Sequence, residues 1–149
     1  MNVLSLVYRR RGQVEEVQRY ASRMQAMQAP EYLGVVKAHQ AWIAWRAGTY
    51  AEVQEYSKEA FQLWERSPLV YYYQWTALWP IMGVALAEKR GADAVKYAGM
   101  LLDPEQQRLP DELTGLLEAA VQSGEANQPE AAYSYLEQAI ALAQKMGYL

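Results

Sequence analysis

Apolar side chains recur every three or four residues along most of the chain, with polar positions between them. This spacing places the apolar residues on one face of an α-helix, whereas no pair of alternating apolar–polar runs flanks a hairpin turn. The pattern therefore predicts helices and no sheet. Eight helices are expected, over residues of about 2–11, 13–28, 30–47, 50–66, 68–88, 91–102, 110–124 and 129–146.

Glycine, asparagine and proline mark the predicted helix ends. Four residues suited to a helix C-cap fall between helical stretches: Gly12, Gly48, Gly91 and Asn127. Four prolines open helical stretches, where proline is well tolerated: Pro30, Pro68, Pro110 and Pro129. Ser67 and Asp103 precede prolines and are expected to act as N-caps. Pro80 lies inside the fifth helix and should kink or split it, because it removes a backbone hydrogen bond.

Equivalent positions recur in four successive pairs of helices. Val17, Val53, Ala94 and Ala132 stand in the second helix of each pair, 36, 41 and 38 positions apart. The residues four and seven positions later, and twelve positions earlier, are mostly small or apolar in every pair, so each set marks one helix face. We therefore expect one domain over 1–149, made of hairpins at about 1–28, 30–66, 68–102 and 110–146.

Three stretches carry a family resemblance. Residues 4–8 read LSLVY, residues 41–52 read AWIAWRAGTYAE, and residues 129–140 read PEAAYSYLEQAI. They resemble the tetratricopeptide repeat (TPR), whose pattern combines a tryptophan, Leu-Gly, a tyrosine and later an alanine, an aromatic and a proline. The resemblance implies an all-α fold, a TPR-like α-solenoid in which about four antiparallel hairpins form a right-handed superhelical stack.

The long, aromatic-rich repeats are similar to one subtype in particular. They resemble the C-terminal repeat arms of large bacterial signalling and transcription regulators that contain an ATPase module. This resemblance implies a cytoplasmic fragment of a longer protein. The apolar ends of the chain agree with this expectation. Val3, Leu4 and Val7 would pack against a preceding repeat, and the apolar Tyr148 lies at the C-terminal end. A second copy of the chain, bound through these terminal hairpins, is the other partner that the ends suggest.

Composition excludes several kinds of site. The chain has no cysteine and one histidine, which excludes disulfides, thiolate metal sites and two-histidine metal motifs. A catalytic triad would have to use His39, whose neighbours Lys37 and Gln40 offer no acid. We expect no cofactor and no enzyme activity. The net charge of −3 and a single basic run, Arg9–Arg11, argue against nucleic acid, and no stretch is apolar enough for a membrane span.

Aromatic residues supply the candidate binding surface. The chain has 12 tyrosines and 5 tryptophans, whose rings carry a polar group and are favoured at partly solvent-exposed positions. In TPR proteins the first helix of each hairpin lines a concave groove. The resemblance thus implies these groove residues: Arg9, Ala38, His39, Trp42, Trp45, Arg46, Thr76 and Trp79. Two interpretations stay open, since the same helical spacing suits rings packed between helices.

The expected function is a non-catalytic protein–protein interaction and regulatory scaffold. Its partner would be a protein or peptide segment, or a neighbouring domain of the same polypeptide, held in the aromatic groove. The alternative is a sensor that binds a small-molecule effector in the same groove by stacking and cation–π contacts.

Overall fold

Eight α-helices and no β-strand form residues 2–149, the part of the chain that the computed structural model describes. They are α1 (Asn2–Arg10), α2 (Val14–Ala26), α3 (Pro30–Ala47), α4 (Tyr50–Glu65), α5 (Trp75–Ala87), α6 (Gly91–Leu101), α7 (Asp111–Glu125) and α8 (Pro129–Met146). The all-α class is therefore confirmed for these residues.

Local sequence signals place most helix ends. Every helix except α5 begins and ends within two residues of its predicted bounds. Gly12, Gly48 and Asn127 have φ of 69°, 76° and 56°, the left-handed conformation expected just past a helix. Gly91 does not take this role. Lys89 has φ of 59° and ends the turn after α5, so Gly91 is the first residue of α6.

The fifth helix starts seven residues later than predicted, at Trp75 instead of Pro68. Residues 67–74 form bends and turns instead of a helix, and the backbone of residues 71–74 is hydrogen-bonded to a segment distant in sequence. Gln106 accepts a hydrogen bond from the Gln74 N–H and donates one to the carbonyl of Tyr71, each at 3.0 Å. Pro80 lies inside α5 without splitting it.

Two predicted N-caps serve turns instead of helices. The Ser67 hydroxyl accepts a hydrogen bond from the Leu69 N–H at 3.3 Å, and the Asp103 carboxylate accepts one from the Glu105 N–H at 2.8 Å. Neither pair lies at the start of a helix. Both side chains bond the backbone two residues ahead, which is a turn alternative to a helix start.

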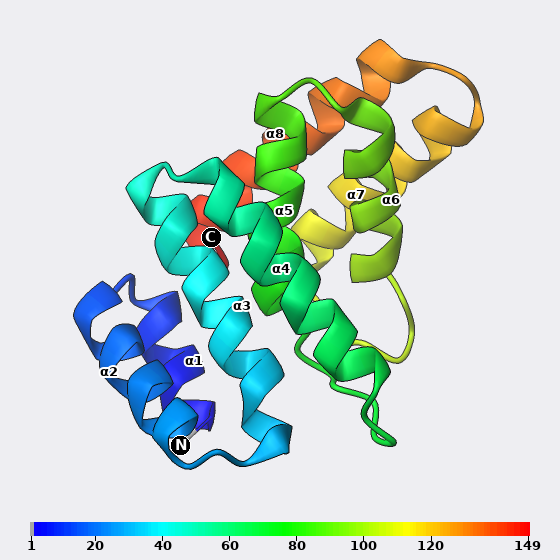
Figure 1. The fold of residues 1–149 in the computed structure, drawn as a ribbon. Coiled ribbons are helices and arrows are strands. Elements are labelled where there is room, and N and C mark those ends of the chain that lie inside the picture. The colour runs from blue at the N-terminus through cyan, green and yellow to red at the C-terminus, as the bar shows by residue number, and fades with distance from the viewer. Residues whose placement is uncertain (1) are drawn as a thin grey trace.

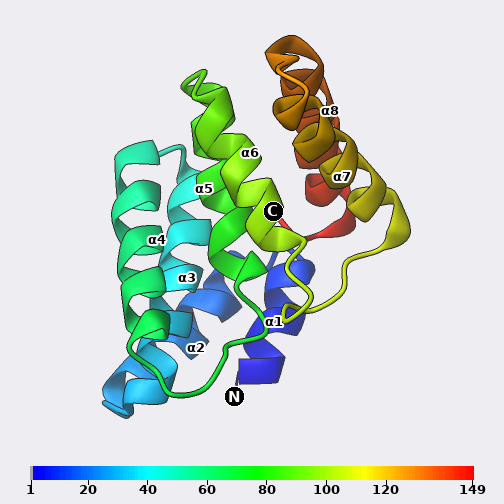
Figure 2. The ribbon, with the colours of Figure 1, turned by 90° about the vertical axis from the view of Figure 1, so that its right-hand side faces the viewer.

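α5 is the central helix of the molecule. It packs against α3, α4, α6 and α8, and every residue from Trp75 to Leu86 is buried (Figures 1 and 2). A helix that is apolar on all sides is stable only when neighbours surround it. Within residues 2–149 no helix, α5 included, has both the length and the apolar character to cross a membrane.

The equivalent positions of the four predicted helix pairs all lie in the interior. In the second helix of each pair these are the anchors and the residues four and seven positions later: Val17, Ala21, Met24, Val53, Ser57, Ala60, Ala94, Ala98, Leu101, Ala132, Leu136 and Ala139. In the first helix they are Ser5, Ala41, Met82 and Ala120. The periodicity of the sequence thus marks the inward faces of all eight helices.

Candidate functional site

The structure buries most of the side chains that were expected to line a groove. Six of them are at most 1% exposed: Arg9, Ala38, His39, Trp42, Thr76 and Trp79. Trp45 is half-buried and Arg46 is exposed. The six buried side chains therefore line no open groove here. Trp42 and Trp79 pack in the core between helices, which is the alternative that the helical spacing left open.

α8 covers the face of α5 that was expected to be open. Near the start of α8, the Tyr133 hydroxyl donates a hydrogen bond to the Leu86 carbonyl at 3.0 Å. Just past its end, the ring of Tyr148 packs edge-on against Trp75, with centroids 5.0 Å apart, and 6.4 Å from Trp79. α8 therefore runs antiparallel along α5. Helical spacing identifies an inward face but not the element that covers it.

Three residues join the end of α1 to the end of α8, and we call Arg10, Gly147 and Tyr148 the clasp. The Arg10 guanidinium donates a hydrogen bond to the Met146 carbonyl at 3.1 Å and lies 4.3 Å from the ring centroid of Tyr148. Gly147 has φ of 82°, and a Cβ there would overlap the backbone carbonyl of Arg10. Figures 1 and 2 show the C-terminal end inside the molecule, near α1.

The clasp corrects the expectation that both ends of the chain expose apolar residues. Tyr148 and Leu149 are 5% and 3% exposed, because they pack into the core beside α5. The N-terminal helix differs, since Val3 and Leu4 are 69% and 49% exposed and Val7 is exposed on the same helix. Of the two ends of residues 2–149, the N-terminal helix α1 is therefore the one that presents an uncovered apolar face.

Arg9 lies in the interior against two tryptophan rings. Its Cζ is 5.4 Å from the ring centroid of Trp42 and 5.2 Å from that of Trp75, distances at which cation–π attraction acts. Its Nη1 donates a long hydrogen bond, 3.4 Å, to the Ala38 carbonyl. Burial lowers the pKa of Arg9 to about 9, so the guanidinium still carries its charge at neutral pH.

His39 and Ser5 form a buried pair beside Arg9. The His39 Nε2 and the Ser5 Oγ are 2.9 Å apart, and the Ser5 hydroxyl donates to the Asn2 carbonyl at 2.6 Å. Burial, with the nearby Arg9 charge, lowers the pKa of His39 to about 3. A serine and a histidine at this distance are two members of a catalytic triad, but His39 Nδ1 has no acid partner and both side chains are fully buried.

An open cleft of about 800 Å³ lies between α4 and α6. Its apolar lining comes from both helices and from the underlying α5: Phe61, Trp64, Ile81, Tyr97 and Met100. Residues 67–71 and the turn at residues 103–106 close one end. Polar and charged side chains make up the rest of the lining, and such a mixed surface suits a partner segment or a small ligand that has polar groups. We call this recess the α4–α6 cleft.

Charged residues divide the α4–α6 cleft into a basic part and an acidic part. Lys58 on α4 and Lys96 on α6 line it, and neither takes part in an ion pair of residues 2–149. Glu65, Asp103 and Glu105 line the region near the closed end. A ligand with separated negative and positive groups would thus have one preferred direction.

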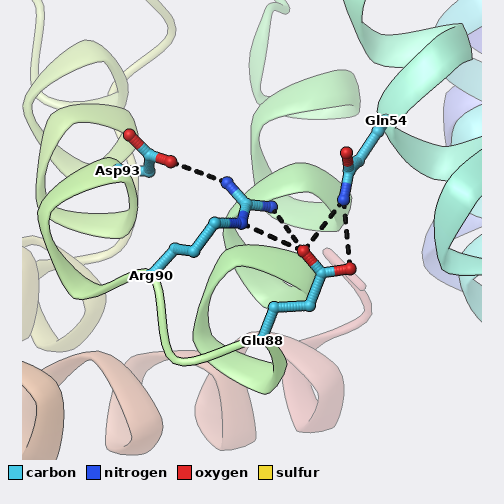
Figure 3. Close-up of polar contacts among 4 residues, drawn as sticks. All are labelled: Gln54, Glu88, Arg90 and Asp93. Carbon is cyan, nitrogen blue, oxygen red and sulfur yellow. Dashed lines mark hydrogen bonds and ion pairs between the residues drawn. The ribbon is translucent and has the colours of Figure 1, made fainter.

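A polar network links the walls at one edge of the α4–α6 cleft (Figure 3). Arg90 binds Asp93 at 2.7 Å and Glu88 at 2.9 Å. The Gln54 amide donates to both carboxylate oxygens of Glu88, at 3.1 and 3.0 Å, and so connects α4 to the turn between α5 and α6. Figure 3 shows Arg90 reaching Asp93 on one side and Glu88 on the other, which fixes the position of this edge.

A second recess, of about 760 Å³, lies between α6 and the turn that precedes α8. Val95, Ala132 and Tyr133 line it, with Lys89 and Glu130 among its charged residues. Within residues 2–149 no three His, Asp or Glu side chains gather closely enough to hold a metal ion. The sequence signals that point to both recesses are weak, because their lining residues come from separate helices and turns.

Comparisons of the chain with protein-family models, with curated proteins and with solved structures found no significant match.

Proposed function

We propose that this chain is a non-catalytic interaction and regulatory module of a larger signalling protein, built as a TPR-like stack of helical hairpins. The burial of equivalent positions in all four hairpins supports the repeat, since stacked repeats bury the same faces in turn. Stacked hairpins expose long surfaces between neighbouring helices, and such surfaces suit binding.

The α4–α6 cleft is the observation that carries this proposal. It offers an apolar lining together with two cations, Lys58 and Lys96, that have no acidic partner in residues 2–149. The partner that fits is a short protein segment with an apolar or aromatic anchor and an acidic group beside it. The binding surface is thus the cleft rather than the buried aromatic face.

A peptide-display selection on the intact chain tests this function. Selected peptides should combine an aromatic or large apolar residue with Asp or Glu. The double variant Lys58→Glu/Lys96→Glu should weaken their binding at least tenfold, because it places like charges opposite the acidic group. Lys145→Glu is the matched control, since Lys145 lies on α8 away from the cleft lining. Peptides that bind the double variant and the parent equally well would contradict the proposal.

The exposed face of α1 supports a second kind of contact for the same module. Val3, Leu4 and Val7 form an uncovered apolar stripe that a neighbouring hairpin of the same polypeptide, or a second copy of the chain, could bury. Light scattering of the chain against a Val3→Lys/Val7→Lys variant distinguishes the two. A dimer that the variant abolishes indicates a second copy, and two monomers leave the neighbouring hairpin as the partner.

The second candidate function is the sensing of a small-molecule effector. The buried Arg9 favours it, because a charged side chain in the interior without an acidic partner is unfavourable for folding alone. The peptide-display experiment does not involve Arg9, so the two functions can fail separately.

A further inference from the structure

Arg9 is a buried cation without a buried anion. It is 1% exposed, and no ion pair of residues 2–149 includes it. A buried guanidinium normally has a carboxylate partner, because the loss of hydration is otherwise uncompensated. The two tryptophan rings contact the guanidinium but offer no oxygen to its N–H groups.

The free N–H groups of Arg9 lie on one edge of the guanidinium. Nη1 is the atom bonded to the Ala38 carbonyl, whereas Nε and Nη2 have no partner. Nε and Nη2 form the side-on edge, where two N–H bonds point in parallel. This edge matches the two oxygens of a carboxylate or of a phosphate, in the bidentate geometry that makes arginine–oxyanion pairs strong.

One further buried donor lies against the guanidinium. The indole Nε1 of Trp42 is buried without a partner, and an indole nitrogen can only donate. His39 Nδ1 is also unpaired, but it is an acceptor, because the Ser5 hydroxyl donates to Asn2 and the neutral ring therefore carries its proton on Nε2. A ligand with negatively charged oxygens would therefore supply acceptors to the free N–H groups of Arg9 and Trp42.

We propose that Arg9 binds a small oxyanion, a carboxylate or a phosphate, on its Nε–Nη2 edge, with Trp42 and Trp75 holding the guanidinium plane. The inference deepens the effector-sensing candidate by naming its ligand class, and it is independent of peptide binding in the α4–α6 cleft. Trp75 contacts both Arg9 and Tyr148. Trp75 thus connects the anion site to the clasp and gives binding a route to the contact between α1 and α8.

Thermal unfolding of the intact chain in sodium acetate, sodium phosphate and sodium chloride, at matched ionic strength, tests this site. Acetate or phosphate should raise Tm by several degrees in a saturable manner, and chloride should not. A response to acetate alone identifies a carboxylate site, and a response to phosphate alone a phosphate site. Arg9→Met should abolish the response, whereas Arg11→Met, the matched control at an exposed neighbouring arginine, should keep it.

Arg9→Met should itself fold, because an apolar chain of similar length removes an unpaired buried charge. The ¹⁵N resonance of the Arg9 Nε–H in the unmodified chain provides a second readout that needs no variant, and it should shift on addition of the anion that raises Tm. Equal Tm increases in all three salts, with an unmoved Nε–H resonance, would show an electrolyte effect only and overturn the proposal.

Discussion

Two tryptophans on α3, Trp42 and Trp45, differ in burial although they lie within one helical turn of each other. They lie three positions apart on α3, yet Trp42 is fully buried and Trp45 is half-buried against Tyr50. Their spacing with Arg46 indicates a shared helix face, which suits a groove and a core equally well. The sequence could therefore not separate the two interpretations, because the covering elements, α1 and α8, are set by contacts between distant residues.

Replacement of Trp42 by alanine should lower the free energy of unfolding by about 3–5 kcal/mol, since it removes a fully buried ring and leaves a cavity. Urea denaturation measures the change. Leu69→Ala is the control, because Leu69 is 77% exposed and should change stability by less than about 0.5 kcal/mol. A Trp42→Ala variant as stable as the control would contradict the core position.

His39 should make the fold sensitive to mild acid. Its pKa is lowered to about 3 in the folded chain, whereas in the unfolded chain it titrates at its ordinary value of 6.5. Below that value the unfolded chain binds a proton that the folded chain excludes. The free energy of unfolding should therefore fall with decreasing pH, at up to about 1.4 kcal/mol per pH unit.

The window of about pH 5–6.5 isolates this contribution, because most carboxyl groups stay ionised there. Urea denaturation across the window should give a steeper pH dependence for the parent chain than for His39→Gln. Equal slopes would show that His39 is protonated in the folded state.

Among the elements, α5 is the helix whose start could not be predicted from the local sequence. Seven helices follow the apolar spacing and the terminal glycines and prolines to within two residues. The start of α5 does not, because Gln106 and Gln107, more than thirty positions away, bond the backbone at residues 71–74. Nothing in the sequence of residues 67–74 indicates that Gln106 and Gln107 bond to this segment. The α4–α6 cleft could not be predicted from the sequence either, because its lining residues come from two different hairpins.

The contact between α1 and α8 depends on a glycine at position 147. Gly147→Ala should destabilise the chain more than Gly48→Ala, which is the matched control. Both glycines have left-handed φ, 82° and 76°, so both variants share the backbone strain. Only at Gly147 would the added Cβ meet the Arg10 carbonyl, since nothing lies within 4 Å at Gly48. Equal losses of unfolding free energy in the two variants would rule out this close approach.

At the scale of the whole molecule, the clasp couples the first hairpin to the last. Arg10→Ala removes the hydrogen bond to Met146 and the contact with the Tyr148 ring. Amide hydrogen exchange should therefore rise together in α1 and at the end of α8, and stay unchanged in α4. Arg11→Ala is the control, as Arg11 is exposed. Faster exchange in α1 alone would mean that the two ends are independent.

The clasp also affects how the molecule would respond to a mechanical pull on its ends. α1 has nine residues and is therefore roughly 13 Å long, so Asn2 and Leu149 lie about one short helix apart across the clasp. A pull on the two ends would load the clasp residues Arg10, Gly147 and Tyr148 together with the contact between α1 and α2. The chain would thus resist the pull until these contacts break together, whereas a stack without contacts between its ends would extend gradually.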